Sequence, residues 1–175
     1  MKTYTLSSLM LGIAALALLS GCGRQDNKSA ATTAASTEAS TPARAAPAEG
    51  RAIVIVGNDA MKFDVTEIRA TPGEALAVTL KNTGTMPKFS MGHNWVLLAA
   101  NVDVATFASD AAQSVKTEYV PTAKPERVLA STKLLGPAES DTVRFYAPTK
   151  PGRYTFICSF PGHFQVGMKG ELIVK

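Results

Sequence analysis

Short apolar runs recur along residues 51–175, and each is bounded by Gly, Pro, Asn or Asp. Runs of this kind, some alternating and some continuous, are typical of β-strands. The predicted strands are Ala52–Val56, Lys62–Arg69, Leu76–Leu80, His93–Leu98, Val128–Leu135, Thr142–Tyr146, Tyr154–Cys158 and Glu171–Val174. One stretch, Val102–Lys116, is rich in alanine with apolar residues near helical spacing, which predicts an inserted helix. The pattern favours an all-β sandwich or barrel.

The chain before residue 51 follows a different pattern. Lys2 precedes an apolar run, Leu11–Leu19, that is too short to span a bilayer comfortably. The run ends at Leu19-Ser-Gly-Cys22, which resembles a bacterial lipobox. We predict a lipoprotein signal peptide over 1–21 and lipid attachment at Cys22; an ordinary signal peptide with an incidental cysteine is the alternative. The expected location is the periplasm, membrane-anchored, and Gly23 favours the outer membrane.

Residues 22–50 are predicted to be a flexible linker. They are rich in Ala, Thr, Ser and Pro and contain no aromatic residue and no aliphatic residue larger than Ala. Such a composition buries too little apolar surface to offset the entropy of ordering. The third segment, 51–175, has the length of one ordinary domain.

Charge points to no nucleic-acid partner. Lys and Arg number 18 in the whole chain and Asp and Glu 14, which gives a formal net charge of +4. The charges are scattered rather than clustered, whereas a nucleic-acid interface shows a basic patch or stripe.

The candidate chemistry lies in the cysteines and histidines. The chain has two cysteines, Cys22 and Cys158, and two histidines, His93 and His163. If Cys22 is acylated, Cys158 has no disulfide partner, and a metal is one possible occupant of such a thiol. Cys158, His163 and Met168 follow one another closely, and Pro-Gly supplies a bend between the first two. Two imidazoles, one thiolate and a thioether are the ligand set of blue-copper electron-transfer sites.

Other interpretations compete with this one. Each ligand candidate taken alone could be a core residue. Zinc also binds Cys and His, but zinc hydrolysis needs a nearby general base, and the nearest carboxylate, Glu171, lies outside the motifs. A copper enzyme such as a nitrite reductase needs a second copper and further histidines. A copper storage or delivery protein is the alternative function, although the six methionines are dispersed. We predict a non-catalytic electron carrier with one Cu(I)/Cu(II) ion.

The domain resembles the azurins, bacterial members of the cupredoxin family, over nearly all of residues 52–175. The matching segments, in azurin order, are Gly57-Asn-Asp with Met61 and Phe63, Met91-Gly-His-Asn-Trp-Val-Leu97, Thr132-Lys-Leu134, Cys158-Ser-Phe-Pro-Gly-His163 and Met168-Lys-Gly170. The resemblance implies a cupredoxin-like Greek-key β-barrel of about eight strands with a helical flap near 102–116.

The resemblance also implies roles around the metal. His93 and His163 would each provide a ring nitrogen, Cys158 its thiolate, Met168 an axial thioether and Gly92 a weak axial carbonyl. Asn94 would tie the two ligand loops together. The backbone N–H groups of Asn94 and Phe160 would donate to the Cys158 sulfur and tune its electronics.

Partner docking is implied at the same end. His163 would lie at the surface edge as the electron's exit, within an apolar patch of Met86, Met91 and Phe164. The expected partners are redox proteins such as cytochromes or reductases, bound transiently by a monomer. Trp95 would be a core residue.

Three features depart from the azurin pattern. Four residues separate His163 from Met168, where azurins usually have three, so the axial distance is open. The disulfide near the start of azurin domains has no counterpart here. Asn82 stands where azurins often carry a pH-sensitive histidine, so a weaker pH dependence of the potential is expected.

Overall fold

The computed structural model of the protein describes residues 45–175. The predicted signal peptide, Cys22 and most of the predicted linker lie outside this range, so the statements about them stay predictions. No helix within the described range is long and apolar enough to cross a membrane.

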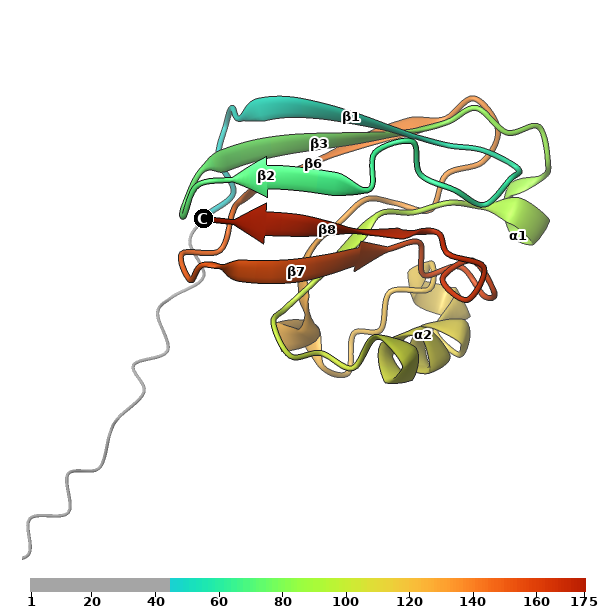
Figure 1. Ribbon diagram of the computed structural model, residues 1–175. Coiled ribbons are helices and arrows are strands. Elements are labelled where there is room, and N and C mark those ends of the chain that lie inside the picture. Colours follow the sequence, from blue (N-terminus) through green and yellow to red (C-terminus); the bar gives the residue numbers. More distant parts are fainter. Residues whose placement is uncertain (1–44) are drawn as a thin grey trace, which may run out of the picture. The chain divides into compact units, whose positions relative to one another are not determined.

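Two β-sheets form the domain (Figure 1). The smaller sheet has the strand order β1-β3-β6. Its strands are β1 (Arg51–Gly57), β3 (Ala75–Asn82) and β6 (Ser140–Tyr146). β1 pairs with β3 in parallel and β3 with β6 in antiparallel.

The larger sheet has the strand order β2-β8-β7-β4-β5. Its strands are β2 (Glu67–Ala70), β8 (Lys169–Val174), β7 (Gly152–Ile157), β4 (Val96–Leu98) and β5 (Val128–Ser131). β2 and β8 are parallel and the other pairs are antiparallel. The eight strands in two sheets confirm the predicted all-β, cupredoxin-like fold.

The main core lies between the sheets. The smaller sheet contributes Leu76, Val78 and Leu80, and the larger contributes Leu97 and Phe156, all fully buried. Burying a side chain of this size stabilises the fold by about 1.5–3 kcal/mol.

Trp95 bridges the two sheets, in agreement with its predicted place in the core. It is fully buried, and its ring centroid lies 5.8 Å from that of Phe145 and 5.4 Å from that of Phe156.

A second cluster covers the outer face of the larger sheet. Val96, Leu98 and Ile157 point away from the main core and are buried by Phe107 and Ala111 of helix α2 (Val104–Ala112). β4 is therefore buried on both faces, which explains why its sequence is continuously apolar.

The helix is shorter than the predicted Val102–Lys116. The Asp103 carboxylate accepts from the Thr106 N–H at 2.7 Å and starts it. After Ala112 the chain continues as a 3₁₀ turn, η1 (Val115–Thr117), and then reverses through Glu118 and Tyr119, which both have positive φ. Two further short elements, α1 (Lys88–Met91) and η2 (Pro125–Arg127), were not predicted.

Three predicted strands are too long. The Lys62–Arg69 strand is wrong over its first half, because the Asp64 carboxylate accepts from the Val56 N–H at 2.6 Å and folds that part into a loop. The strands predicted for His93–Leu98 and Val128–Leu135 are shortened at the same place. There His93 and Leu135 pair only with each other, in an isolated bridge.

The two ends of the domain are defined by the direction of β1. At one end, called the terminal end, the Arg51 guanidinium donates to the Arg69 carbonyl at 2.5 Å and the Lys175 N–H to the Ala70 carbonyl at 3.1 Å. β1 runs from there to Gly57, which lies beside His93 at the other end. Helix α1 is at this second end, called the ligand end (Figure 1).

Candidate metal centre

The three strongest ligand candidates converge at the ligand end. The Nδ1 atoms of His93 and His163 lie 3.2 Å apart, and the Cys158 Sγ lies 3.4 Å from His163 Nδ1 and 4.0 Å from His93 Nδ1. The centre of the circle through these three atoms is about 2.1 Å from each, close to the 2.0–2.3 Å of metal–nitrogen and metal–sulfur bonds in proteins. One ion can therefore contact all three donors.

Backbone hydrogen bonds hold each candidate ligand in place. His93 precedes β4 and exchanges two bonds with Leu135, at 3.1 and 2.7 Å. Cys158 follows β7, and its N–H donates to the Met168 carbonyl at 3.0 Å. The Met168 N–H donates in turn to the His163 carbonyl at 2.9 Å. The three residues of the C-terminal ligand loop are thus locked to one another.

Asn94 joins the two ligand segments. Its Oδ1 accepts from the Ser159 N–H at 2.8 Å and its Nδ2 donates to the Ser159 Oγ at 2.9 Å. Both residues are buried, so these bonds are shielded from water. Ser159 also donates to the Tyr119 carbonyl at 2.6 Å, a partner that the sequence did not identify.

The Cys158 thiol is fully buried. Burial raises its pKa to about 12, while the backbone N–H groups of Asn94 and Phe160, which donate toward the sulfur, oppose the rise. Without a cation the sulfur is therefore protonated near neutral pH, and metal binding displaces the proton.

Both imidazoles are neutral near pH 7. Burial lowers the pKa of His163 to about 4, and the charge of His93 adds to this. Burial also lowers the pKa of His93, against the carbonyl of Asn58 and the carboxylate of Asp59, which favour its charged form. Neutral imidazoles present the lone pairs that bind metal. Two such nitrogens beside a thiol suit copper, which takes both imidazole and thiolate.

Met168 reaches the same place. Its side chain is fully buried, and its methyl group lies against Gly57: a Cβ atom added to Gly57 would be 2.9 Å from Met168 Cε and 3.6 Å from the His93 ring. Gly92 is buried as the C-cap of α1, and an added Cβ there would lie 2.6 Å from the Lys88 carbonyl. Any larger residue at Gly92 would shift α1 or the chain leading to His93.

The predicted surface around His163 needs correction. His163 is only 2% exposed rather than at a surface edge, with its ring centroid 4.7 Å from that of Phe160. Phe164 packs on the outer face of the larger sheet, with the Lys169 ammonium 5.3 Å from its ring centroid. Met86 is 44% exposed and Met91 is half-buried.

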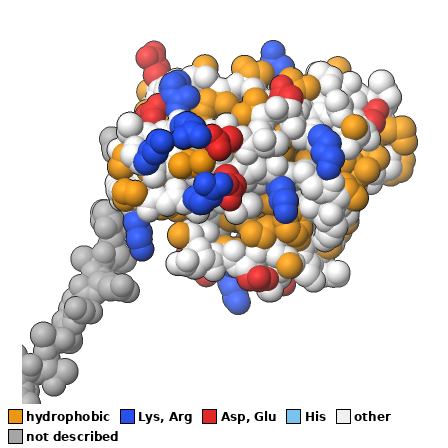
Figure 2. Space-filling view, viewed as in Figure 1, with side chains coloured by type: hydrophobic (Ala, Val, Ile, Leu, Met, Phe, Trp, Pro, Cys, Tyr) orange, Lys and Arg blue, Asp and Glu red, His pale blue; other side chains and the backbone are white. Residues whose placement is uncertain are grey.

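Phe89 is an exposed aromatic that the sequence analysis missed. It lies in α1 and is 83% exposed. Hydrophobic side chains gather at the end of the molecule where α1 lies, whereas charged side chains gather over β2, β8 and β7 (Figure 2). The sequence did hold a signal for Phe89. It lies between Pro87 and Gly92, outside every predicted strand, so no core position accounts for its aromatic ring.

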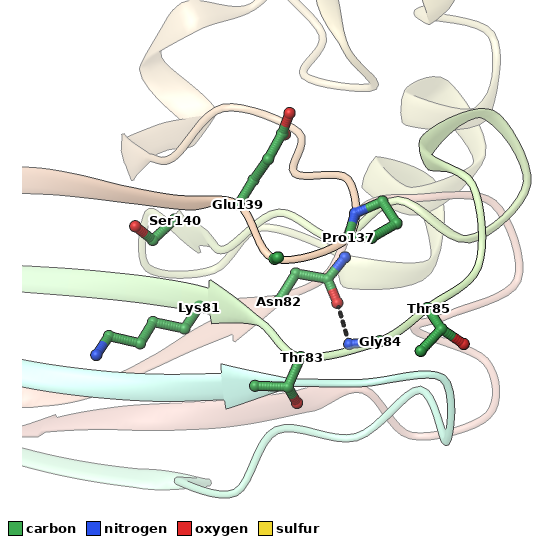
Figure 3. Close-up of a pocket in the computed structure, with 9 residues that line it drawn as sticks. Lys81, Asn82, Thr83, Gly84, Thr85, Pro137, Glu139 and Ser140 are labelled. Carbon is green, nitrogen blue, oxygen red and sulfur yellow. Dashed lines mark hydrogen bonds between the residues drawn. The ribbon is translucent and has the colours of Figure 1, made fainter.

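Asn82 takes a structural role. It is buried, its Oδ1 accepts from the Gly84 N–H at 2.8 Å (Figure 3), and its Nδ2 donates to the Leu135 carbonyl at 3.3 Å. Leu135 is the backbone partner of His93, so a side chain that does not titrate supports the segment that holds this ligand.

The comparisons with known proteins decide the family. The family model for copper-binding proteins of the plastocyanin/azurin family matches residues 51–175. The chain belongs to this family. Azurin from Bordetella pertussis is 43% identical over 121 residues, which are 67% of this chain and 79% of that protein. Azurin from Pseudomonas aeruginosa is 39% identical over 126 residues, which are 69% of this chain and 82% of that protein.

Solved cupredoxin structures agree. Auracyanin from Roseiflexus castenholzii is 32% identical, covers 71% of this chain and 96% of its own, and superposes with a TM-score of 0.64. An azurin from Methylomonas sp. strain J is 31% identical, covers 71% and 97%, and gives a TM-score of 0.62. The azurin-like resemblance is confirmed, and the cofactor of this cupredoxin is copper, which the three converging donors fit.

Proposed function

We propose that this cupredoxin is a type 1 copper protein that carries single electrons between redox partners at the cell envelope. His93, Cys158 and His163 would hold the ion, and the Met168 thioether and the Gly92 carbonyl would be weaker donors to it. The observation that carries the proposal is the convergence of Nδ1, Nδ1 and Sγ on one buried point. Copper supplies the one-electron chemistry, by alternating between Cu(I) and Cu(II).

The protein's contribution is a site that does not rearrange. Cys158 and both histidines are 0–2% exposed, so water does not compete for the donors. The Asn94–Ser159 bonds and the His93–Leu135 bridge hold them from two sides. Because the donors are fixed, both oxidation states of copper would share nearly the same geometry. Little nuclear rearrangement would then accompany electron transfer.

Partner docking is assigned to the ligand end. Phe89 and Met86 are exposed there, and a small apolar surface suits brief contacts with cytochromes or reductases. Met91 and Phe164 are half-buried and contribute less than the sequence analysis expected. A monomer suffices for this role, and a carrier of this kind catalyses no reaction of its own.

The proposed location follows from the N-terminal sequence. A lipid on Cys22 would anchor the protein at the periplasmic side of a membrane, with residues 23–50 as the connection to the domain. Gly23 after the lipidated cysteine favours the outer membrane.

The visible spectrum of the copper-loaded protein tests the function. We expect an intense thiolate-to-Cu(II) absorption band and a reversible one-electron voltammetric wave. Cys158→Ser should abolish both, and the matched control Cys22→Ala, which removes the other cysteine, should keep both. A colourless complex that binds only Cu(I) would instead indicate storage or delivery.

A further inference from the structure

The end of β1 and the loop that follows it contact the ligand loop, residues 158–168, at two points. One contact is with the methyl group of Met168, and the other is with the backbone carbonyl two residues before Met168. The first is at Gly57, where β1 ends, and the second is at Lys62, further along the loop.

Gly57 leaves the space that the Met168 methyl group occupies. A Cβ atom at residue 57 would lie 2.9 Å from Met168 Cε, closer than real Cβ contacts. The same atom would lie 3.6 Å from His93 Cδ2, an ordinary contact. A side chain here would therefore displace the thioether before it displaced the imidazole.

Lys62 holds the backbone just before Met168. Its ammonium group donates to the carbonyl of Val166, a residue otherwise distant in sequence. The intervening Gly167 has a φ of +96°, and a Cβ there would lie 2.7 Å from the Lys62 Nζ. The close approach of the ammonium therefore uses both the left-handed backbone and the missing side chain of Gly167.

The backbone N–H groups of this segment donate within the ligand loop. The N–H groups of Val166, Gly167 and Met168 donate to carbonyls of residues 162, 164 and 163. They fix the loop's internal shape. The Lys62 bond instead joins the ligand loop to the smaller sheet, because Lys62 lies in the loop that follows β1.

We propose that Gly57 and Lys62 are positioning residues that set how closely the Met168 thioether approaches the metal. Gly57 admits the methyl group, and Lys62 fixes the carbonyl two residues before it. The inference rests on the proposed function only in taking Met168 as an axial neighbour of copper. Residues that orient a ligand in this way tune the affinity of the site and the spectrum of the bound metal.

Lys62→Met in the full chain tests the proposal, with Lys81→Met as the matched control. Lys81 lies near the end of β3, paired in register with Val56, so the control removes the same charge from the same end of the molecule. We expect Lys62→Met to change the intensity ratio of the sulfur-to-copper absorption bands. It should also speed copper loss to a chelator about tenfold. Lys81→Met should do neither.

A double-mutant cycle with Met168→Leu identifies the route of the effect. If Lys62 acts through Met168, Lys62→Met should change the band ratio no further in the Met168→Leu protein. Gly57→Ala should change the band ratio in the same Met168-dependent way. Equal spectra for Lys62→Met and Lys81→Met, or an effect that persists without Met168, would overturn the proposal.

The metal-free protein separates this inference from the function. In apo-protein, Lys62→Met should speed hydrogen exchange at the Met168 amide relative to Lys81→Met. The reason is that the ligand loop loses its hydrogen bond to the loop that follows β1 of the smaller sheet. A wild-type protein without a visible band would refute the proposed function while this exchange difference still reported on the loop. If Lys62→Met left exchange at the Met168 amide unchanged while the wild-type copper protein was blue, only the positioning role of Lys62 would be refuted.

Discussion

The ligand end and the terminal end of the domain are built from different interactions. At the terminal end the ion pairs are exposed or partly exposed: Arg51–Glu74 joins β1 to the loop before β3, Arg153–Glu171 joins β7 to β8, and Arg69–Glu67 lies within β2. At the ligand end the polar groups around the candidate ligands are buried, neutral and bonded to one another, as in Asn94 with Ser159 and His93 with Leu135. Charged groups such as the Lys88–Glu118 ion pair lie outside this network. The exposed side chains there include Phe89 and Met86.

The two ends show that buried polar networks and exposed ion pairs serve different purposes. A buried polar group without its partner costs about 1–3 kcal/mol, so a buried network permits few arrangements and holds ligands rigidly. Exposed ion pairs are screened by water and salt and tolerate change. The molecule thus combines a rigid end, to which we assign partner docking, with a charged end that tolerates substitution.

The largest expected effect is at Asn94. Asn94→Ala leaves the Ser159 N–H without its acceptor and separates the two ligand segments. We expect the apo-protein to lose about 1–3 kcal/mol of unfolding free energy and copper affinity to fall about 10–100-fold. Urea unfolding and competition with a chelator measure these two quantities. An unchanged copper affinity would show that the ligand segments are held independently.

A smaller effect is expected at the exposed apolar surface. Phe89→Asp should slow electron self-exchange between reduced and oxidised copies about tenfold, which corresponds to ~1.4 kcal/mol of lost docking energy. Line broadening in NMR spectra of mixtures measures this rate without a known partner. Leu129→Asp, which places the same charge on another exposed apolar side chain, is the control. Equal slowing in both variants would argue against docking at α1.

The pH dependence of the potential sharpens the role of Asn82. The wild-type potential should stay nearly flat between about pH 5 and 8, because an amide does not titrate. In Asn82→His, protonation at low pH adds a positive charge and favours Cu(I). The potential should therefore fall as pH rises, by at most about 59 mV per pH unit. Voltammetry across this range gives the slope. A steep wild-type slope would mean that another group controls the potential.

The smallest effect is expected at the terminal end. The Arg51 guanidinium lowers the pKa of the Glu74 carboxyl, and the Thr71 N–H contributes. Glu74→Gln should therefore cost no more than about 1 kcal/mol at pH 7, because the pair is partly exposed. A lowered carboxyl pKa adds stability above pH 4.5 that is lost as pH falls through the folded-state pKa. The two proteins should then converge in urea unfolding at acid pH, with identical copper spectra throughout.

The sequence predicted the strands best where a regular apolar pattern ends at Gly, Pro or Asn, as in β1 and β3. It failed at residues 62–66, because the Asp64 carboxylate replaces a strand partner of Val56, and no local pattern reveals that bond. The helix was overestimated because residues 113–116 contain no Gly or Pro that would end it. The chain instead turns at Glu118 and Tyr119, which have positive φ, and the Tyr119 ring packs edge-on against Phe160, a contact between distant segments that no local pattern reveals.

The site was predictable to the extent that its chemistry uses rare residue types. Two histidines and a cysteine without a disulfide partner stand out in any composition. Lys62, Ser159 and Gly57 do not, because lysine, serine and glycine are common and act here through distant backbone or through empty space. The burial of His163 also depends on neighbours that only the folded chain assembles.

The direction of β1 has a practical consequence. Arg51 starts the strand at the terminal end, and Gly57 finishes it beside His93. A tag, an electrode linker or a fusion joined ahead of residue 51 is therefore attached on the side away from copper. A protein film immobilised in this way should present its redox face to the solution, which makes N-terminal attachment the natural choice for a bioelectronic device.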